Sequence, residues 1–194
     1  MKVGIFGGTF DPPHIAHSII AERVLEEFGL DQIVWVPAFD PPHKSLHQLS
    51  SFTHRVAMVD AAVSNHSSFQ VSEIESTLDC PTYTIRMLRA LRKQFSHAKR
   101  YLILGGDSLN HFHTWMEPEA IMEHVELIVY PRAGHLIEEM DLPPYLSDQI
   151  HYIQAPMMSL SGEHVRTCLI EEKSIRYLVL ESVRDYIVHH QIYH

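Results

Sequence analysis

The chain has 194 residues, of which 45% are hydrophobic, and a formal net charge of −9 at neutral pH. That length and composition predict one domain, residues 1–194, with a substantial core. The negative charge argues against general nucleic-acid binding, which needs a basic face. No apolar run approaches the roughly 20 residues of a membrane span, and Met1 runs straight into a predicted strand, so we expect no signal peptide and no membrane contact. Cys80 and Cys168 form neither a disulfide framework nor a metal knuckle, which favours a cytoplasmic protein.

Apolar runs and helical spacing alternate along the chain. The predicted strands are 3–6, 33–36, an alternating edge strand at 69–74, then 101–104, 127–130 and 150–153. Helical spacing covers residues 19–25 with a stop at Gly29, and then 51–63, 84–94, a helix from Ser161, and 180–189. Such alternation predicts an α/β fold with a Rossmann-like, doubly wound parallel sheet. Ligands of that fold bind at the carboxyl ends of the strands, so segments that directly follow a strand are the candidate site.

The segment after the first strand combines a glycine turn with two histidines. Gly7 and Gly8 let the backbone turn sharply and approach a ligand closely. Residues 12–13 are prolines, which suit the first turn of the next helix, and His14 and His17 would share a face of that turn. A helix N-terminus attracts phosphate, and two imidazoles can donate hydrogen bonds to it. The alternative is a tight turn followed by two surface histidines.

Two later segments carry basic side chains just after strands. Lys44 follows two prolines and a histidine, where its ammonium could meet a polyphosphate or lie in an exposed loop. Arg132 follows the strand at 127–130 and either binds phosphate as a rigid fork or forms a surface salt bridge.

Two more segments favour nucleotide binding. Asp107 follows two glycines after the strand at 101–104, where a carboxylate can hold the hydroxyls of a ribose. Trp115 either stacks on a ligand ring or belongs to the core. Ser161 is a good N-cap, and Arg166, one turn into that helix, could reach a bound triphosphate.

Sixteen histidines invite a metal-site interpretation. None stands with cysteine or glutamate at a zinc-ligand spacing such as HExxH. We therefore predict no metal site made by protein ligands, and a solvated surface for most of these histidines.

In order, these segments strongly resemble the bacterial nicotinate mononucleotide adenylyltransferases of the nucleotidyltransferase superfamily, over nearly the whole chain. The matching segments are 7–17 (GGTFDPPHxGH, with Ala16 for glycine), 41–44 (PPHK), Arg55 with Met58 (RxxM), 81–84 (PSYT), 105–115 (GxDxxxxFxxW), 130–134 (PRxG) and 176–187 (RYLVPxxVxxYI, with Leu180 for proline).

The resemblance implies a nucleotidyltransferase-type fold with a small C-terminal helical extension. It implies adenylyl transfer from ATP to nicotinate mononucleotide, giving deamido-NAD and pyrophosphate in NAD biosynthesis, with Mg²⁺ bridged by the substrates. The implied ATP-binding residues are Gly7, Gly8, Thr9, Phe10, His14, His17, Asp107, Ser161 and Arg166. The implied nicotinate-nucleotide residues are Thr84, Trp115, Met116 through its backbone N–H, and Arg132. His14, His17, Lys44 and Arg166 would carry the catalysis.

One departure weakens the predicted ATP contact. The family usually has SSTxxR at the start of the helix that follows the last strand, whereas this chain has Gly162 and Glu163 in place of hydroxyl residues. A carboxylate at Glu163 would repel triphosphate unless it points away, which predicts weaker affinity for ATP.

Two alternatives stay open. A related transferase would use nicotinamide mononucleotide or pantetheine phosphate as acceptor, and a non-catalytic regulator would bind nucleotide without turnover. A class I aminoacyl-tRNA synthetase shares a HIGH-type motif, but this chain is too short and too acidic for one. The sequence leaves open whether the protein is a homo-oligomer.

Overall fold

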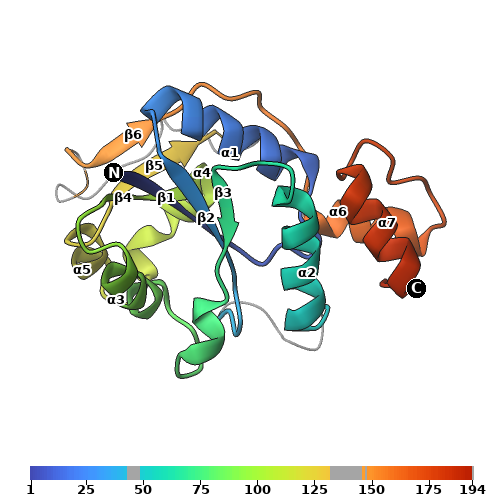
Figure 1. Ribbon diagram of the computed structural model, residues 1–194, viewed down its shortest axis with the longest axis horizontal. Coiled ribbons are helices and arrows are strands. Elements are labelled where there is room, and N and C mark those ends of the chain that lie inside the picture. The colour runs from blue at the N-terminus through green and yellow to red at the C-terminus, as the bar shows by residue number, and fades with distance from the viewer. Residues whose placement is uncertain (43–48, 132–145, 147, 194) are drawn as a thin grey trace.

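A computed structural model of the protein describes residues 1–42, 49–131, 146 and 148–193 (Figure 1). In this part of the chain, six parallel strands form a sheet in the order β3-β2-β1-β4-β5-β6. The strands are β1 Lys2–Gly8, β2 Gln32–Pro37, β3 Phe69–Val71, β4 Lys99–Gly105, β5 Glu126–Tyr130 and β6 Ile150–Tyr152. The predicted Rossmann-like, doubly wound α/β fold is therefore confirmed.

The strand order reverses between β1 and β4, and this point locates the ligand site of a doubly wound sheet. Phe6 of β1 pairs in register with Ile103 of β4. The glycines that end the two strands, Gly8 and Gly105, consequently leave the sheet side by side at one edge.

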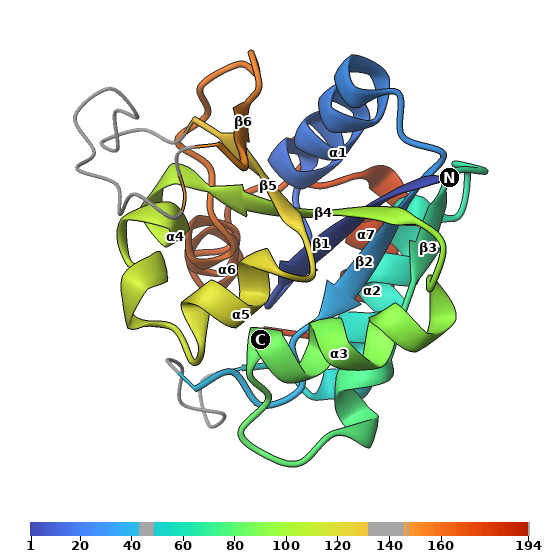
Figure 2. The same cartoon turned by 90° about the vertical axis from the view of Figure 1, so that its left-hand side faces the viewer.

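Helices cover both faces of the sheet. The helices of the described residues are α1 Ile15–Phe28, α2 Phe52–Val63, η2 Ile74–Thr77, α3 Thr84–Gln94, α4 Gly106–Asn110, η3 Phe112–Thr114, α5 Pro118–Met122, α6 Gly162–Ile170 and α7 Glu181–His190, where η marks a 3₁₀ helix. Figure 2 shows the sheet between α1 on one side and α3 with α5 on the other. Apolar side chains of β1 alternate accordingly, because Ile5 joins the core under α3 and Phe6 joins the core under α1 and α2.

The C-terminal helices form a third apolar cluster beside α2. Met58 of α2 is fully buried against Val165 of α6 and Val183 and Ile187 of α7. This cluster lies at the right of Figure 1, away from β6, and is the C-terminal helical extension that the resemblance implied.

Three predicted elements differ from the structure. The helix after β1 begins at Ile15, with His14 as its N-cap in an extended conformation, so the two prolines precede the first turn. The reason is that a residue before proline is driven out of the helical region, which applies to Pro12. The edge strand predicted at 69–74 is shorter: β3 ends at Val71, which is its last residue paired with β2, and a 3₁₀ helix follows from Ile74. Asp107, which was expected only to follow two glycines after the strand, lies in the short helix α4, where no helix was predicted.

No helix in residues 1–42, 49–131, 146 and 148–193 is long and apolar enough to cross a membrane.

Candidate active site

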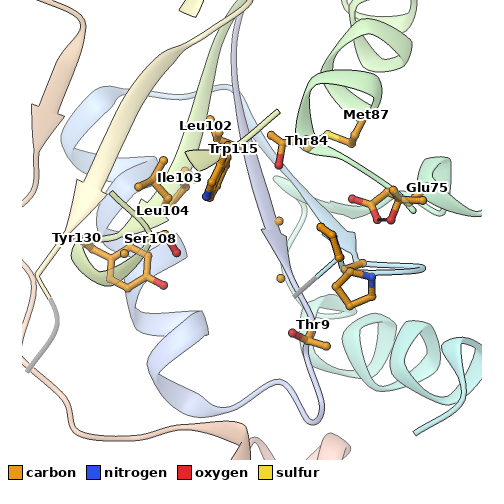
Figure 3. Close-up of a pocket in the computed structure, with 17 residues that line it drawn as sticks. Thr9, Glu75, Thr84, Met87, Leu102, Ile103, Leu104, Ser108, Trp115 and Tyr130 are labelled. Carbon is orange, nitrogen blue, oxygen red and sulfur yellow. Dashed lines mark hydrogen bonds between the residues drawn. The ribbon is translucent and has the colours of Figure 1, made fainter. Parts of the chain in front are cut away.

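Two adjoining cavities open at the carboxyl ends of β1 and β4. One has a volume of about 230 Å³ and is drawn in Figure 3; the other has a volume of about 650 Å³. Their common wall consists of Gly7, Gly8, Thr9, Ser108 and Tyr130. The cavities therefore meet at the end of β1, of which Gly7 and Gly8 are the last two residues.

The glycine turn is shaped by the side chain of Phe10. A Cβ on Gly8 would lie 2.9 Å from the ring of Phe10, which is buried beneath the turn. Phe10 itself has a φ of 49°, in the left-handed region that few non-glycine residues adopt. Gly8 thus lets the chain fold back over Phe10 and brings the backbone of this turn to the cavity wall.

His14 and His17 stand together on the larger cavity. The backbone N–H of His14 donates to Nδ1 of His17 over 3.1 Å, and both side chains line the cavity. Because Nδ1 of His17 accepts this bond, the neutral ring of His17 carries its proton on Nε2. The predicted pairing of the two imidazoles is therefore found, with His14 as the N-cap instead of a residue of the first turn.

The N-terminus of α6 also lines the larger cavity. The hydroxyl of Ser161 accepts from the backbone N–H of His164 over 3.1 Å, which confirms the predicted N-cap. Arg166, one turn further on, donates from Nη1 to the backbone carbonyl of Asp11 over 2.6 Å and lines the cavity. The guanidinium is thereby tied to the segment after β1 and lines the same cavity as the histidine pair.

Gly162 and Glu163 both border this cavity, and each departs from the expected hydroxyl residue. A Cβ on Gly162 would come within 2.7 Å of the backbone oxygen of Asp11, so glycine permits the close approach of α6 to the first motif. Glu163 is exposed at the cavity wall and places a carboxylate near the predicted triphosphate site.

Asp107 completes the larger cavity from α4. A Cβ on Gly105 would lie 2.5 Å from Oδ1 of Asp107, so this glycine leaves room for the carboxylate at the end of β4. All the residues that the sequence assigned to ATP line this one cavity: Gly7, Gly8, Thr9, Phe10, His14, His17, Asp107, Ser161 and Arg166.

The smaller cavity contains the residues that the sequence assigned to the nicotinate ring. Thr84, the first residue of α3, and Trp115 both line it, and both are labelled in Figure 3. The indole of Trp115 packs on Phe112 with ring centroids 5.2 Å apart. Met116 follows directly, and its side chain packs against the core under α3. Lys44 and Arg132 lie outside the described residues.

Glu75 lies in the wall of the smaller cavity and was not found from the sequence. Its Oε2 accepts hydrogen bonds from the Phe39 backbone N–H over 2.9 Å and from the Thr82 hydroxyl over 2.7 Å. Burial raises the pKa of this carboxyl, although the two hydrogen bonds and Arg55 oppose the rise. Glu75 therefore joins the segment after β2 to the segment before α3 on the cavity wall.

Arg55 belongs to a segment that matched the family, but the resemblance assigned it no role. Its side chain connects the loops that follow β1 and β2. Its buried guanidinium donates to the carbonyls of Thr9, Ala38 and Ser50 over 3.0, 2.6 and 3.1 Å. Burial lowers the pKa of this guanidinium. The side chain holds the loops after β1 and β2 together and does not line either cavity.

Tyr130 borders both cavities and was also missed. It is the last residue of β5, at the carboxyl end where ligands of this fold bind, but it lay inside the predicted strand 127–130 and was not counted with the residues that follow a strand. The signal was present in the sequence, whereas that for Glu75 was absent, because its burial depends on Thr82 and Phe39 in other segments.

Comparisons with known proteins agree with this geometry. Residues 5–173 match the cytidylyltransferase-like family. A probable nicotinate-nucleotide adenylyltransferase of Salinibacter ruber is 44% identical over 193 residues, which cover 100% of this chain and 98% of the relative. One of Lachnoclostridium phytofermentans is 36% identical and covers 99% of this chain and 98% of the relative.

A solved structure has the same fold. The Plasmodium falciparum nicotinic acid mononucleotide adenylyltransferase complexed with NaAD superposes with a TM-score of 0.82 at 23% identity, covering 99% of this chain and 97% of that one. The chain thus belongs to the cytidylyltransferase-like family of nucleotidyltransferases. Within that family it belongs with the nicotinate-nucleotide adenylyltransferases.

Proposed function

We propose that the protein transfers the adenylyl group of ATP to nicotinate mononucleotide, producing deamido-NAD and pyrophosphate in NAD biosynthesis. The observation that carries this proposal is the pair of adjoining cavities. One is lined by histidines, an arginine and a helix N-terminus, which suit a triphosphate. The other contains an indole, which suits a pyridine ring. Relatives named for this activity support the same reaction.

The reaction needs alignment more than proton transfer. An oxygen of the mononucleotide's 5′-phosphate attacks the α-phosphorus of ATP, and the bond from that phosphorus to the bridging oxygen of pyrophosphate breaks. The nucleophile is already an anion, so no general base is required. Holding two substrates in line can contribute about 7–11 kcal/mol in favourable cases. Charge neutralisation by fixed donors supplies the remaining assistance that we assign to the protein.

We assign the donors as follows. Nε2–H of His17 and the ring of His14 bind phosphate oxygens of ATP, and Arg166 binds them as well. We assign Lys44 a role at the reacting groups on the resemblance alone, and Asp107 the role of holding a ribose. Gly7, Gly8, Thr9 and Phe10 shape the backbone that borders the triphosphate, and Ser161 caps the helix that points at it. This set is supported by the shared cavity of its described members.

The acceptor nucleotide occupies the smaller cavity in this proposal. Trp115 stacks on the nicotinate ring, and Thr84 with the backbone N–H of Met116 binds its carboxylate. Arg132 binds the nucleotide as well. Support comes from Thr84 and Trp115, which border one cavity although they belong to separate segments.

We propose Mg²⁺ as the metal of the reaction, because a divalent cation bound together with the substrates would neutralise phosphate charge. The described residues contain no group of three or more histidine, cysteine, aspartate or glutamate side chains that could hold an ion. Mg²⁺ fits a site with few protein ligands, since it keeps several waters and binds chiefly through substrate phosphates. Its ligands would therefore be phosphate oxygens and water.

A substrate panel tests the proposed reaction. ATP and Mg²⁺ are combined with nicotinate mononucleotide, nicotinamide mononucleotide or pantetheine phosphate, and pyrophosphate release is measured for each. The expected result is the highest kcat/KM with nicotinate mononucleotide. Preference for another acceptor would make the protein a related transferase, and no pyrophosphate release with any acceptor would make it a binding protein.

We further propose that residues 1–194 act as one cytoplasmic domain, in a monomer or a homo-oligomer. The two cysteines support a reducing compartment, because Cys80 is exposed, Cys168 is buried, and both are free thiols.

A further inference from the structure

The last residues of the described chain contact the segment at residues 7–17, which we call the first motif. The hydroxyl of Tyr193 donates to Oδ1 of Asp11 over 2.5 Å, although 182 positions separate the two residues. Asp11 is 4% exposed, so this bond forms inside the protein. Ile192 anchors the segment in the apolar cluster of α2, α6 and α7, and Tyr193 adopts a φ of 72° to reach the aspartate.

Asp11 is bonded on all three of its oxygens. Oδ1 accepts from Tyr193, Oδ2 accepts from the Ser50 backbone N–H over 3.3 Å, and the backbone oxygen accepts from Arg166 over 2.6 Å. Oδ2 itself lies 3.7 Å from Nη1 of Arg166, which makes a loose ion pair but is beyond hydrogen-bonding distance. The carboxylate is thus bonded by neutral donors and stops short of a direct bond to the guanidinium.

The Tyr193 hydroxyl is suited to this task. Burial and the neighbouring Asp11 carboxylate raise its pKa, so the hydroxyl keeps its proton and acts as the donor. Without that donor, Oδ1 of Asp11 would be a buried carboxylate oxygen lacking its shortest hydrogen bond. Two arginines lie near Asp11. Arg55 is engaged with three backbone carbonyls, whereas Arg166 lines the larger cavity, and the carboxylate would turn toward Arg166.

We propose that Tyr193 is a positioning residue for ATP. By bonding Asp11, it prevents that carboxylate from closing onto Arg166 and leaves the guanidinium available to the phosphates of ATP. The effect is electrostatic, because an arginine in a full ion pair offers less positive charge and fewer donors to a second anion. This inference rests on the proposed binding of ATP at Arg166.

The test compares Tyr193→Phe with Tyr186→Phe in the full-length protein. Both changes remove a single phenolic hydroxyl. The Tyr193 hydroxyl donates to Oδ1 of Asp11 and, over 3.9 Å, to Sδ of Met58, whereas the Tyr186 hydroxyl bonds to Nδ1 of His54 over 3.1 Å, away from the two cavities. In Tyr193→Phe, the KM for ATP should rise about tenfold, as expected for a lost hydrogen bond to a charged group. The KM for nicotinate mononucleotide should stay within about twofold, since the smaller cavity is untouched.

A double-mutant cycle with Asp11→Asn identifies the route of the effect. An asparagine at position 11 has no charge to draw Arg166 away, so adding Tyr193→Phe to that background should leave the KM for ATP within about twofold. Thermal unfolding of each variant separates a general loss of stability from the specific loss of ATP affinity.

Three results would overturn the role of Tyr193: an unchanged KM for ATP, an equal rise in both KM values, or an undiminished effect in the Asp11→Asn background. If the wild-type protein released no pyrophosphate from ATP, the proposed function itself would fail. The wild-type control therefore distinguishes the two failures.

Discussion

The imidazole rings of His14 and His17 are stacked, with centroids 3.7 Å apart and planes inclined by 18°. The ring of His17 also packs edge-on against Phe10, whose centroid is 5.0 Å away. With Nδ1 occupied by the His14 backbone N–H, the orientation of His17 is fixed by three separate contacts. A donor that is fixed before the substrate arrives needs no rearrangement as charge develops, which is the condition for large electrostatic catalysis.

His17→Ala should therefore reduce kcat by about 10²–10³-fold, the cost of removing one preorganised donor. The fold should persist, because His17 is only partly buried in α1 and alanine is the strongest helix former. Steady-state kinetics and circular dichroism measure the two effects. His66→Ala is the control, since His66 pairs with Glu22 away from both cavities. Turnover near the wild-type value in His17→Ala would remove this histidine from the phosphate site.

Trp115→Ala should act on the other substrate. Stacking of a base on an aromatic side chain contributes about 1–3 kcal/mol, so the KM for nicotinate mononucleotide should rise by about tenfold or more. The KM for ATP should change little, because Trp115 does not line the larger cavity. Trp115→Phe keeps an aromatic face and should recover part of the loss. If each variant instead raised the KM for ATP as much as the KM for nicotinate mononucleotide, Trp115 would have a general role in packing with Phe112.

Glu163→Gln should strengthen ATP binding. The exposed carboxylate at the wall of the larger cavity repels the triphosphate, and its removal should lower the KM for ATP by about threefold, in the range of an exposed charge interaction. Stability should fall by about 0.3–1 kcal/mol, because a negative charge in the first turn of α6 favours the helix dipole. Kinetics at low and high salt test the assignment, since an electrostatic gain must shrink as salt rises.

Gly162→Ala should have the opposite effect. The new Cβ would lie 2.7 Å from the backbone oxygen of Asp11, which cannot yield as a flexible side chain could. The strain should lower the free energy of unfolding by about 1–3 kcal/mol and move α6 away from the first motif. Because Arg166 is held by that same oxygen, the KM for ATP should rise. Thr167→Ala, at an exposed position of α6, is the matched control. An unchanged KM for ATP would show that Arg166 tolerates the shift.

The sequence was sufficient to predict the strands of the sheet and residues that line the larger cavity. The strands at 101–104 and 127–130 are apolar runs, and they were found within a few residues of β4 and β5 because both faces of these strands are buried. Residues assigned to ATP from separate motifs line one cavity, since each follows a parallel strand or opens the next helix. Placement in the chain was enough to predict their convergence.

Contacts between distant segments were beyond such reasoning. Nothing near Tyr193 in the sequence indicates that its hydroxyl bonds to Asp11, because the approach depends on how α7 packs on α2. Short helices such as α5 were missed for another reason: five residues carry too little periodicity to be detected. The start of α1 was misplaced because proline suits a first helical turn in general, but Pro12 precedes a second proline.

Glu75→Gln tests the buried carboxyl of the smaller cavity through pH. Burial raises the pKa of Glu75 above its ordinary value of 4.5, so between that value and the raised one the folded protein binds more protons than the unfolded chain. The free energy of unfolding must therefore decrease as pH rises through this window, and the whole penalty is present above it.

Glutamine can accept the same two hydrogen bonds from Phe39 and Thr82 and does not ionise. The melting temperature of Glu75→Gln should exceed that of the wild type at neutral pH, and the difference should shrink as pH falls toward 4.5 and below. Glu119→Gln, which removes an exposed carboxylate from α5, is the control. If the melting temperatures of Glu75→Gln and wild type instead differ by the same amount at every pH in this range, Glu75 ionises in the folded protein as it does in the unfolded chain.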